Sequence, residues 1–212
     1  MLLVCVTGGL GSGKSTLSAL LARRGAIVVD ADELARRALD PGTTAYAQVC
    51  DLFGDEVVKP DGQLDRAAIA ARVFSDESKR RALESILHPE VFRGLVETLE
   101  KHKDSQDVVV FDAPLTVETG FHRECDVVVV VSASLGAQVA RATRDRDLTE
   151  EEARARIAAQ LPAAQREAVA DFVVRNDGSL EELQREADTI WEELARRAGG
   201  ADDNDRAPRG GR

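Results

Sequence analysis

The sequence contains few aromatic residues and no long apolar run, and each shortage excludes a class of protein. Only 4% of its 212 residues are aromatic although 43% are hydrophobic, so alanine, valine and leucine must supply the core. No apolar run approaches the ~20 residues that cross a bilayer, and no basic segment precedes the first of them. We therefore expect a soluble, cytoplasmic α/β protein with valine-rich inner strands and no membrane partner.

Basic residues and cysteines are also scarce. With 28 Lys and Arg against 38 Asp and Glu, the net charge is -10, whereas a nucleic-acid binder usually presents a basic surface. Nucleic acid is therefore not an expected partner. The three cysteines are far apart and form no C-x-x-C pair. Cys5 lies inside an apolar strand, which predicts a buried thiol and a reducing compartment rather than a disulfide framework.

Short apolar runs alternate with helical patterns along the chain, which predicts a parallel sheet. The predicted strands are Leu2–Val6, Ala26–Val29, Asp107–Phe111, Val127–Val131 and Asp171–Val174. The segments between them are charged and helical. We expect a core from residues 1–32, 105–140 and 167–198, a helical insertion at 33–104, a second helical stretch at 141–166 and a disordered tail at 199–212.

The turn after the first strand matches the phosphate-binding pattern G-x-x-x-x-G-K-[ST] completely, from Gly8 to Ser15. Its glycines allow positive φ and let main-chain N–H groups approach phosphate oxygens, and the following helix adds its positive N-terminal end. Lys14 is placed to reach the β- and γ-phosphates, and the Ser15 hydroxyl to bind Mg²⁺. The predicted ATP contacts are Gly9, Leu10, Gly11, Ser12, Gly13, Lys14, Ser15 and Thr16.

Three carboxylates follow predicted strands, at the sheet edge where ligands of open α/β folds bind. They are Asp30, Asp32 and Asp112. A kinase of this kind needs a base for the acceptor hydroxyl and often a carboxylate near Mg²⁺, so Asp112 is a second candidate metal ligand beside Ser15. One of Asp30 and Asp32 can instead cap the helix that starts near Glu33, and Asp112 can be an ordinary turn residue.

Arginines crowd the second helical stretch. Because charge develops on the transferred phosphate, arginines near it favour transfer, and a mobile segment can bring them in. For any single arginine here a solvated helix surface is the simpler interpretation, but the cluster as a whole favours a lid. Its members are Arg141, Arg144, Arg146, Arg154, Arg156 and Arg166.

The motifs together resemble those of the dephospho-coenzyme A kinase family. The likeness starts in residues 7–16 and in Asp30-Ala31-Asp32, and it covers nearly all of the chain before the tail. The further matching motifs are Asp40-Pro41-Gly42, Leu52-Phe53-Gly54, Asp61-Gly62-x-Leu64-Asp65-Arg66, Leu87-His88-Pro89, residues 112–118, Arg156-Ile157-x-x-Gln160, Ala170-Asp171 and Asn176-x-Gly178. The P-loop is shared by many families, whereas the D-A-D, H-P and P-L-x-x-E set in this order is much more specific.

The resemblance implies a P-loop kinase that transfers phosphate from ATP to the ribose 3′-hydroxyl of dephospho-coenzyme A, the final step of coenzyme A synthesis. It makes the core a P-loop core, the insertion at 33–104 the acceptor-binding part and the stretch at 141–166 the lid. It makes Asp32 the catalytic base and Arg141 the lid arginine, with Arg144 and Arg146 as rivals or helpers. The acceptor site it implies contains Asp32, His88, Pro114, Leu115 and Glu118. The sequence departs from the family at Thr116, where a leucine is common, and this should alter packing more than chemistry. The His88-Pro89 pair predicts the start of a helix.

Two other functions remain as alternatives to a dephospho-coenzyme A kinase. A P-loop kinase for another small acceptor, such as a nucleotide, nucleoside or sugar acid, has the same cradle. A nucleotide-dependent switch such as a GTPase would need a guanine-binding N-K-x-D box, and Asn176-Asp177-Gly178-Ser179 lacks its lysine and its second aspartate. The sequence leaves the oligomeric state open.

Overall fold

The structure is a computed structural model that describes residues 1–146 and 148–200, without the side chains of residues 74 and 75. The chain divides into two compact units. Residues 1–29 and the described residues from 102 onward form the first, and residues 30–101 form the second. The second unit is therefore one continuous segment inserted between two strands of the first. The expected tail lies largely outside the described residues, which end at Gly200.

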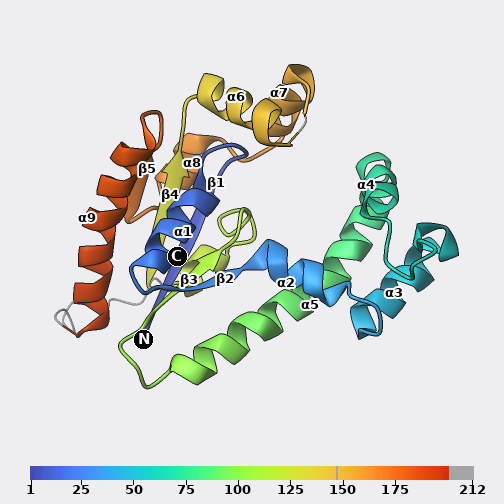
Figure 1. The fold of residues 1–212 in the computed structure, drawn as a ribbon, viewed down its shortest axis with the longest axis horizontal. Helices are drawn as coiled ribbons and strands as arrows, with labels where there is room; N and C mark the ends of the chain where they lie inside the picture. The colour runs from blue at the N-terminus through green and yellow to red at the C-terminus, as the bar shows by residue number, and fades with distance from the viewer. Residues whose placement is uncertain (147, 201–212) are drawn as a thin grey trace. The chain divides into compact units, whose positions relative to one another are not determined.

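The first unit contains a five-stranded sheet (Figure 1). Its strands are β1 (Leu2–Gly8), β2 (Ile27–Asp30), β3 (Val108–Asp112), β4 (Val127–Ser132) and β5 (Phe172–Arg175). The strand order is β2-β3-β1-β4-β5, and β1 pairs in parallel with both β3 and β4. The register places Val6 beside Asp112 on one side and Val129 on the other. The carboxyl ends of the central strands therefore meet at one edge, as predicted from the alternating pattern.

One face of the sheet is covered by α1 (Lys14–Arg23) and α9 (Leu180–Ala198) (Figure 1). Alternate strand valines pack with Leu17 and Leu21 of α1 and with Ile190 and Leu194 of α9. Every residue of β1 is buried, as expected for a strand covered on both faces. Ser179 begins α9 with a capping box, which confirms it as the predicted N-cap.

The opposite face is covered in part by the segment 113–126, which includes η2 (Phe121–Glu124), and by α8 (Ala163–Glu167). The ring of Phe121 meets that of Phe111 edge to face, with centroids 5.2 Å apart. The Ser132 hydroxyl donates a hydrogen bond to Glu167 at 2.6 Å, which joins α8 to the end of β4. This hydrogen bond holds α8 against the carboxyl end of β4.

Cys5 and Cys125 form a disulfide, with their Cα atoms 6.0 Å apart. The expectation of a buried thiol at Cys5 is therefore wrong. The two residues are 120 positions apart, and the parallel pairing of β1 with β4 brings them together. Sequence spacing carries no sign of that pairing. Among the described residues, Cys50 is the free cysteine.

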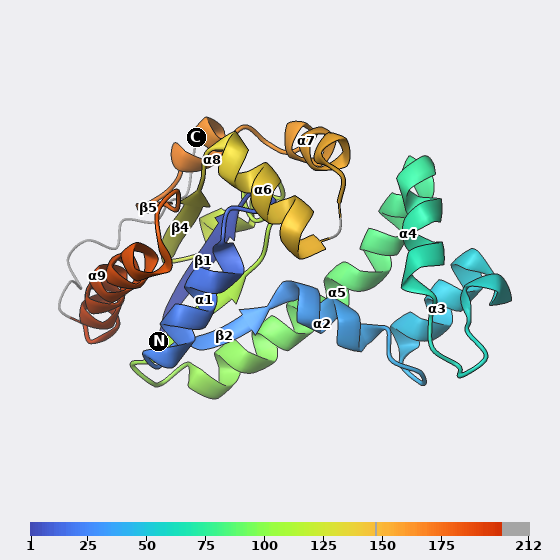
Figure 2. The ribbon, with the colours of Figure 1, turned by 45° about the horizontal axis from the view of Figure 1, so that its top comes forward.

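Helices α6 (Leu135–Arg146) and α7 (Glu150–Ala158) pack against each other in the first unit (Figure 2). Val139, Ala142 and Ala153 form a small core between them. Leu10 of the phosphate loop packs against this core. The loop is therefore anchored to the helical pair by an apolar side chain as well as by its own strand and helix.

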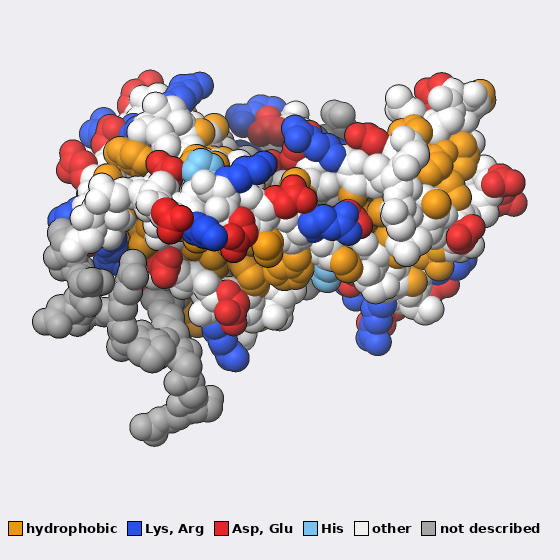
Figure 3. Space-filling view, turned by 90° about the horizontal axis from the view of Figure 1, so that it is seen from below, with side chains coloured by type: hydrophobic (Ala, Val, Ile, Leu, Met, Phe, Trp, Pro, Cys, Tyr) orange, Lys and Arg blue, Asp and Glu red, His pale blue; other side chains and the backbone are white. Residues whose placement is uncertain are grey.

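The second unit is helical, as the sequence predicts. It contains α2 (Ala31–Ala38), α3 (Thr44–Phe53), η1 (Asp55–Val57), α4 (Arg66–Ser75) and α5 (Glu77–His102). Val49, Phe53, Val57, Leu64 and Ile69 form its core. Ion pairs one turn apart, such as Arg37–Glu33, run along its helix surfaces. Basic and acidic side chains also lie interspersed on the face of the molecule in Figure 3.

Helix α5 passes through Pro89 without ending, so the predicted helix start at His88-Pro89 is wrong. Proline removes one N–H donor and usually kinks or breaks a helix, but α5 continues on both sides of Pro89. The strand predictions, in contrast, agree with the structure to within two residues. Among the described residues, no helix combines the length and the apolarity that crossing a membrane requires.

Candidate active site

The phosphate loop connects β1 to α1 at the carboxyl edge of the sheet. Gly11 and Gly13 have φ angles of 70° and 94°, which a residue with a side chain rarely adopts. The Ser12 amide donates to the Gly9 carbonyl at 3.1 Å, which tightens the loop. Helix α1 begins at Lys14, directly after this turn. Its free N–H groups and positive end therefore point into the loop, where they can bind an anion.

Lys14 forms a salt bridge with Asp112, the last residue of β3. The Asp112 side chain is 2% exposed and that of Lys14 13% exposed. Both side chains stand at the carboxyl edge of the sheet, where the sequence predicts them. The pair holds a cation and a carboxylate at the floor of the loop. Ser15 follows Lys14 in the sequence and is exposed in the first turn of α1.

Asn176 and Arg141 brace the loop from the side of β5. The buried Asn176 amide donates to the Ser12 carbonyl at 2.8 Å, and a Cβ on Gly13 would collide with that amide. Arg141 donates to the Asn176 carbonyl at 2.8 Å, and its other terminal nitrogen reaches the carbonyls of Gly11 and Ser12 at 3.3 and 3.4 Å. Arg141 therefore contacts the main chain of the loop, and its predicted role toward the transferred phosphate stays a prediction.

Three polar side chains meet at Gly9, the second residue of the loop. Gln160 accepts a hydrogen bond from the Leu10 amide at 3.0 Å. A Cβ on Gly9 would lie 3.0 Å from Gln138 Oε1, 3.1 Å from Gln160 Oε1 and 3.3 Å from Arg166 Nη1. Glycine at this position therefore leaves room for these three side chains.

A cavity of about 480 Å³ opens over the loop. Its lining includes Gly9 and Lys14 of the loop, and Gly178 and Leu180 between β5 and the start of α9. Its remaining lining residues are Gly11, Ser12, Gly13, Ser15, Thr16, Arg141, Ala142, Arg144, Asp145, Arg146, Asn176 and Leu183. All of the predicted ATP contacts except Leu10 line this cavity. Leu10 instead points into the core of α6 and α7.

Two of the candidate lid arginines, Arg144 and Arg146, also line the cavity. Arg144 binds Asp145 through two nitrogens, at 2.7 and 3.0 Å. Its hydrogen bonds hold the pKa of the Asp145 carboxyl below its usual range, and the pair raises the pKa of Arg144. Both groups therefore stay charged at neutral pH.

In the second unit, Asp30 and Asp32 have different surroundings. Asp30 is the N-cap of α2: its carboxylate accepts hydrogen bonds from the amides of Asp32 and Glu33 at 2.8 and 3.0 Å. The exposed carboxylate of Asp32 makes no hydrogen bond or ion pair with any described residue. Asp32 is therefore the more available proton acceptor of the two. His88 is exposed on α5.

The predicted acceptor residues 114–118 lie in the first unit, after β3. The Pro114 carbonyl accepts a hydrogen bond from the Thr7 hydroxyl at 3.0 Å, and Leu115 is exposed. Thr116 is buried, and its hydroxyl oxygen has no hydrogen-bond partner among the described residues. Glu118 accepts a hydrogen bond from Arg166 Nε at 3.3 Å.

Sequence reasoning gave no role to Gln138, Gln160 or Asn176 and did not single out Arg166. Gln160 and Asn176 belong to motifs that resemble those of the family, but a motif does not show what a side chain contacts. The hydrogen bond of Gln160 spans 150 residues and that of Asn176 spans 164. Only the folded sheet brings these groups to the loop.

A parallel sheet with a Gly-rich loop, a loop lysine and a following helix defines the P-loop class of nucleotide-binding proteins. A family model described as Dephospho-CoA kinase matches residues 2–182. A Thermobifida fusca relative named Dephospho-CoA kinase is 46% identical over 197 residues, which cover 93% of this chain and 98% of the relative. The chain therefore belongs to the dephospho-CoA kinase family.

Solved structures agree with this fold. A Thermus thermophilus crystal structure is 38% identical and superposes with a TM-score of 0.78, covering 91% of this chain and 97% of that one. A dephospho-CoA kinase structure from Campylobacter jejuni is 22% identical with a TM-score of 0.69, covering 92% and 98% of the two chains, and at that identity supports the fold alone. The predicted fold class and family are both confirmed.

Proposed function

We propose that this protein transfers the γ-phosphate of ATP to the ribose 3′-hydroxyl of dephospho-coenzyme A, giving coenzyme A and ADP. The observation that carries the proposal is the phosphate loop, built on β1 and α1 in a chain of the dephospho-CoA kinase family. Main-chain amides, a helix N-terminus and Lys14 supply positive charge at one point. A nucleotide tail carrying several phosphates matches that charge.

We propose one direction for the nucleotide in the cavity. The base and ribose would lie near Gly178 and Leu180, and the phosphates would run along the loop toward Gly9. Lys14 would leave Asp112 to bind the β- and γ-phosphates, since a charged oxygen of the nucleotide can replace the carboxylate. Arg141 and Asn176 would keep the loop in shape while the nucleotide binds.

The donors beside the loop fit Mg²⁺. A kinase magnesium ion is typically held by one or two protein oxygens together with substrate phosphates. Ser15 offers an exposed hydroxyl, and the Asp112 carboxylate ends β3 at the same edge of the sheet. Bound there, Mg²⁺ offsets the negative charge of the β- and γ-phosphates. The described residues hold no cluster of three or more metal-binding side chains, which agrees with a site completed by the nucleotide.

Asp32 is the proposed base. In the transfer, the acceptor oxygen forms a bond to the γ-phosphorus, the bond from that phosphorus to the β–γ bridging oxygen breaks, and the hydroxyl proton passes to Asp32. Asp30 caps α2 and is occupied. Asp32→Asn should lower kcat by about 10²–10⁴-fold with ATP affinity unchanged, the usual range for general-base catalysis.

Asp30→Asn is the matched control, because asparagine caps a helix as well as aspartate does. Near-normal kcat is expected for it. A large loss in Asp30→Asn with a nearly silent Asp32→Asn would move the base to Asp30.

The acceptor is tested by coupled ADP release against a panel of acceptors. We expect turnover with dephospho-coenzyme A well above the ATP-only blank, and none with nucleosides, nucleotides or shikimate. Turnover with one of those and not with dephospho-coenzyme A would show another small-acceptor kinase. Binding of GTP in preference to ATP, with slow acceptor-independent hydrolysis, would instead revive the switch interpretation.

A further inference from the structure

Arg166 is a buried arginine whose charged end is hardly used by the fold. Its side chain is 5% exposed, and its Nε donates to Glu118 at 3.3 Å. Within the part of the chain that the structure describes, neither terminal nitrogen of Arg166 has a hydrogen-bond partner. A guanidinium carries five N–H donors, so four of them remain unengaged. These terminal nitrogens keep some accessible surface, so a ligand can reach them and complete their hydrogen bonds.

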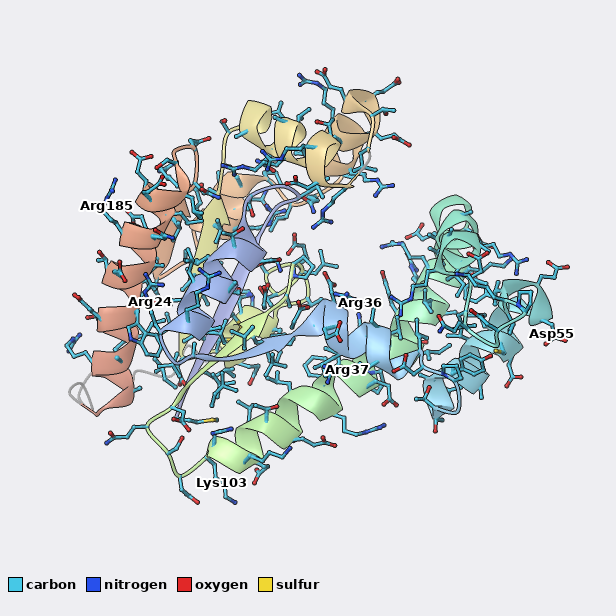
Figure 4. All side chains as sticks on the ribbon, in the orientation of Figure 1. Arg24, Arg36, Arg37, Asp55, Lys103 and Arg185 are labelled. Carbon is cyan, nitrogen blue, oxygen red and sulfur yellow. A yellow bond between two sulfur atoms is a disulfide. The ribbon has the colours of Figure 1, made fainter. Side chains whose placement is uncertain are left out.

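Arg24 shows what a structural arginine looks like in the same unit (Figure 4). It lies between α1 and α9, and its side chain is 18% exposed. Its Nε binds Asp188 at 2.7 Å, and its two terminal nitrogens bind the carbonyls of Leu20 and Gln184 at 2.7 and 3.1 Å. All three nitrogens of Arg24 are engaged by the protein. Arg166 is more deeply buried than Arg24, yet only one of its three nitrogens has a hydrogen-bond partner among the described residues.

The unused end of Arg166 points at the phosphate loop. Its Nη1 lies 3.3 Å from the position that a Gly9 Cβ would occupy. Gly9 also lines the cavity over the loop, whereas the position of a Gly13 Cβ lies beside Asn176, two residues before Gly178. A triphosphate with its base at Gly178 would place its last phosphate toward Gly9. The charge of that phosphate is the partner that Arg166 lacks.

We propose that Arg166 is a catalytic residue that binds the terminal phosphate of ATP and stabilises the charge that develops on it during transfer. Glu118 is a positioning residue: it holds Nε, which turns the two terminal nitrogens toward the loop. Arg166 exchanges no atom or proton in the reaction, and its contribution is electrostatic. The proposal rests on the proposed function for the nature of the nucleotide and for its direction in the cavity.

The test compares two nucleotides that differ by the terminal phosphate. Calorimetry measures the Kd of Mg-ADP and of the Mg complex of the non-hydrolysable β,γ-imido analogue of ATP. In Arg166→Met, the preference for the analogue over ADP should fall about ten- to a hundredfold, the scale of a charge-assisted pair of hydrogen bonds. Its kcat should fall on the order of 10²–10³-fold. Arg166→Lys keeps the positive charge but loses the two parallel N–H donors of the guanidinium. It should recover part of the preference for the analogue and part of kcat.

Arg24→Met is the matched control for the loss of a buried arginine. It should lower Tm and leave the analogue-to-ADP preference unchanged. The same unchanged preference in Arg166→Met would overturn the proposal, whatever happens to Tm, and so would a loss confined to the KM of the acceptor. If Arg166→Met does not fold, Arg166→Gln, which can still donate to Glu118, replaces it. Failure of both variants to fold would make Arg166 structural and also overturn the proposal.

The two proposals fail in distinguishable ways. The nucleotide comparison needs no acceptor, so its outcome stands even if dephospho-coenzyme A proves not to be the substrate. Absence of transfer to dephospho-coenzyme A by the unaltered protein would overturn the proposed function alone.

Discussion

Replacing Asn176 with alanine tests whether the phosphate loop depends on its brace. The substitution removes the amide that donates to the buried Ser12 carbonyl at 2.8 Å. The main-chain bonds of residue 176 to Ser132 and Arg141 stay. A buried hydrogen bond contributes about 0.5–1.5 kcal/mol net, and a carbonyl left unpaired costs about 1–3 kcal/mol. Because Arg141 still reaches the same carbonyl at 3.4 Å, we expect a loss of about 1–2 kcal/mol in the free energy of unfolding.

The loss should appear in nucleotide binding as well as in stability. If the brace sets the shape of the loop, the KM for ATP should rise by about 5- to 30-fold, which corresponds to the same 1–2 kcal/mol, with a smaller change in kcat. Urea unfolding and coupled ADP release measure the two effects. Ser179→Ala is the control, because it removes the N-cap of α9 at a cost of about 1 kcal/mol without a contact to the loop. An equal rise in KM in both variants would refute the reasoning.

Three further predictions concern stability and chemistry away from the loop. Thr116→Val should raise the free energy of unfolding by about 1 kcal/mol, since it removes a buried hydroxyl without a partner among the described residues. Thr7→Val should lower it by about the same amount, because the Thr7 hydroxyl donates a hydrogen bond to the Pro114 carbonyl. Urea titrations in which both variants change stability with the same sign would contradict this. Two arginines of α9 lower the pKa of Glu193 to about 2, so Glu193→Gln should be less stable by no more than about 1 kcal/mol above pH 4.5. That difference should shrink as pH falls from 4.5 toward 2, and a pH-independent difference in urea midpoint would count against the ion pairs. Alkylation of the denatured protein should label Cys50 alone before reduction and three cysteines after it, and three labels without reductant would disprove the disulfide.

The sequence predicts the sheet and the loop well because both depend on local pattern. Continuous valine runs require a strand buried on both faces, as in β4, and the spacing from Gly8 to Lys14 requires a turn with positive φ. The capping choice between Asp30 and Asp32 was not decided by sequence, since either can cap a helix there. In the structure Asp30 is the cap, because its carboxylate accepts hydrogen bonds from two amides of α2.

The contacts that shape the loop could not be predicted, because they join distant segments. Asn176 and Gln160 reach the loop only after β4, β5 and α8 have packed. Their residue types are common at helix ends and turns, so nothing local distinguishes them. Arg166 is one of six arginines in its stretch by sequence, and burial alone sets it apart.

Transfer of label from [γ-³²P]ATP is the most direct test of the central claim, that the loop around Lys14 delivers phosphate to an acceptor hydroxyl. With Mg²⁺ and dephospho-coenzyme A, the unaltered protein should place the label on the 3′-oxygen of the acceptor. Lys14→Ala, with an unchanged circular-dichroism spectrum, should lose this transfer by on the order of 10²-fold or more. Label released only as inorganic phosphate, or near-normal transfer by Lys14→Ala, would contradict the account.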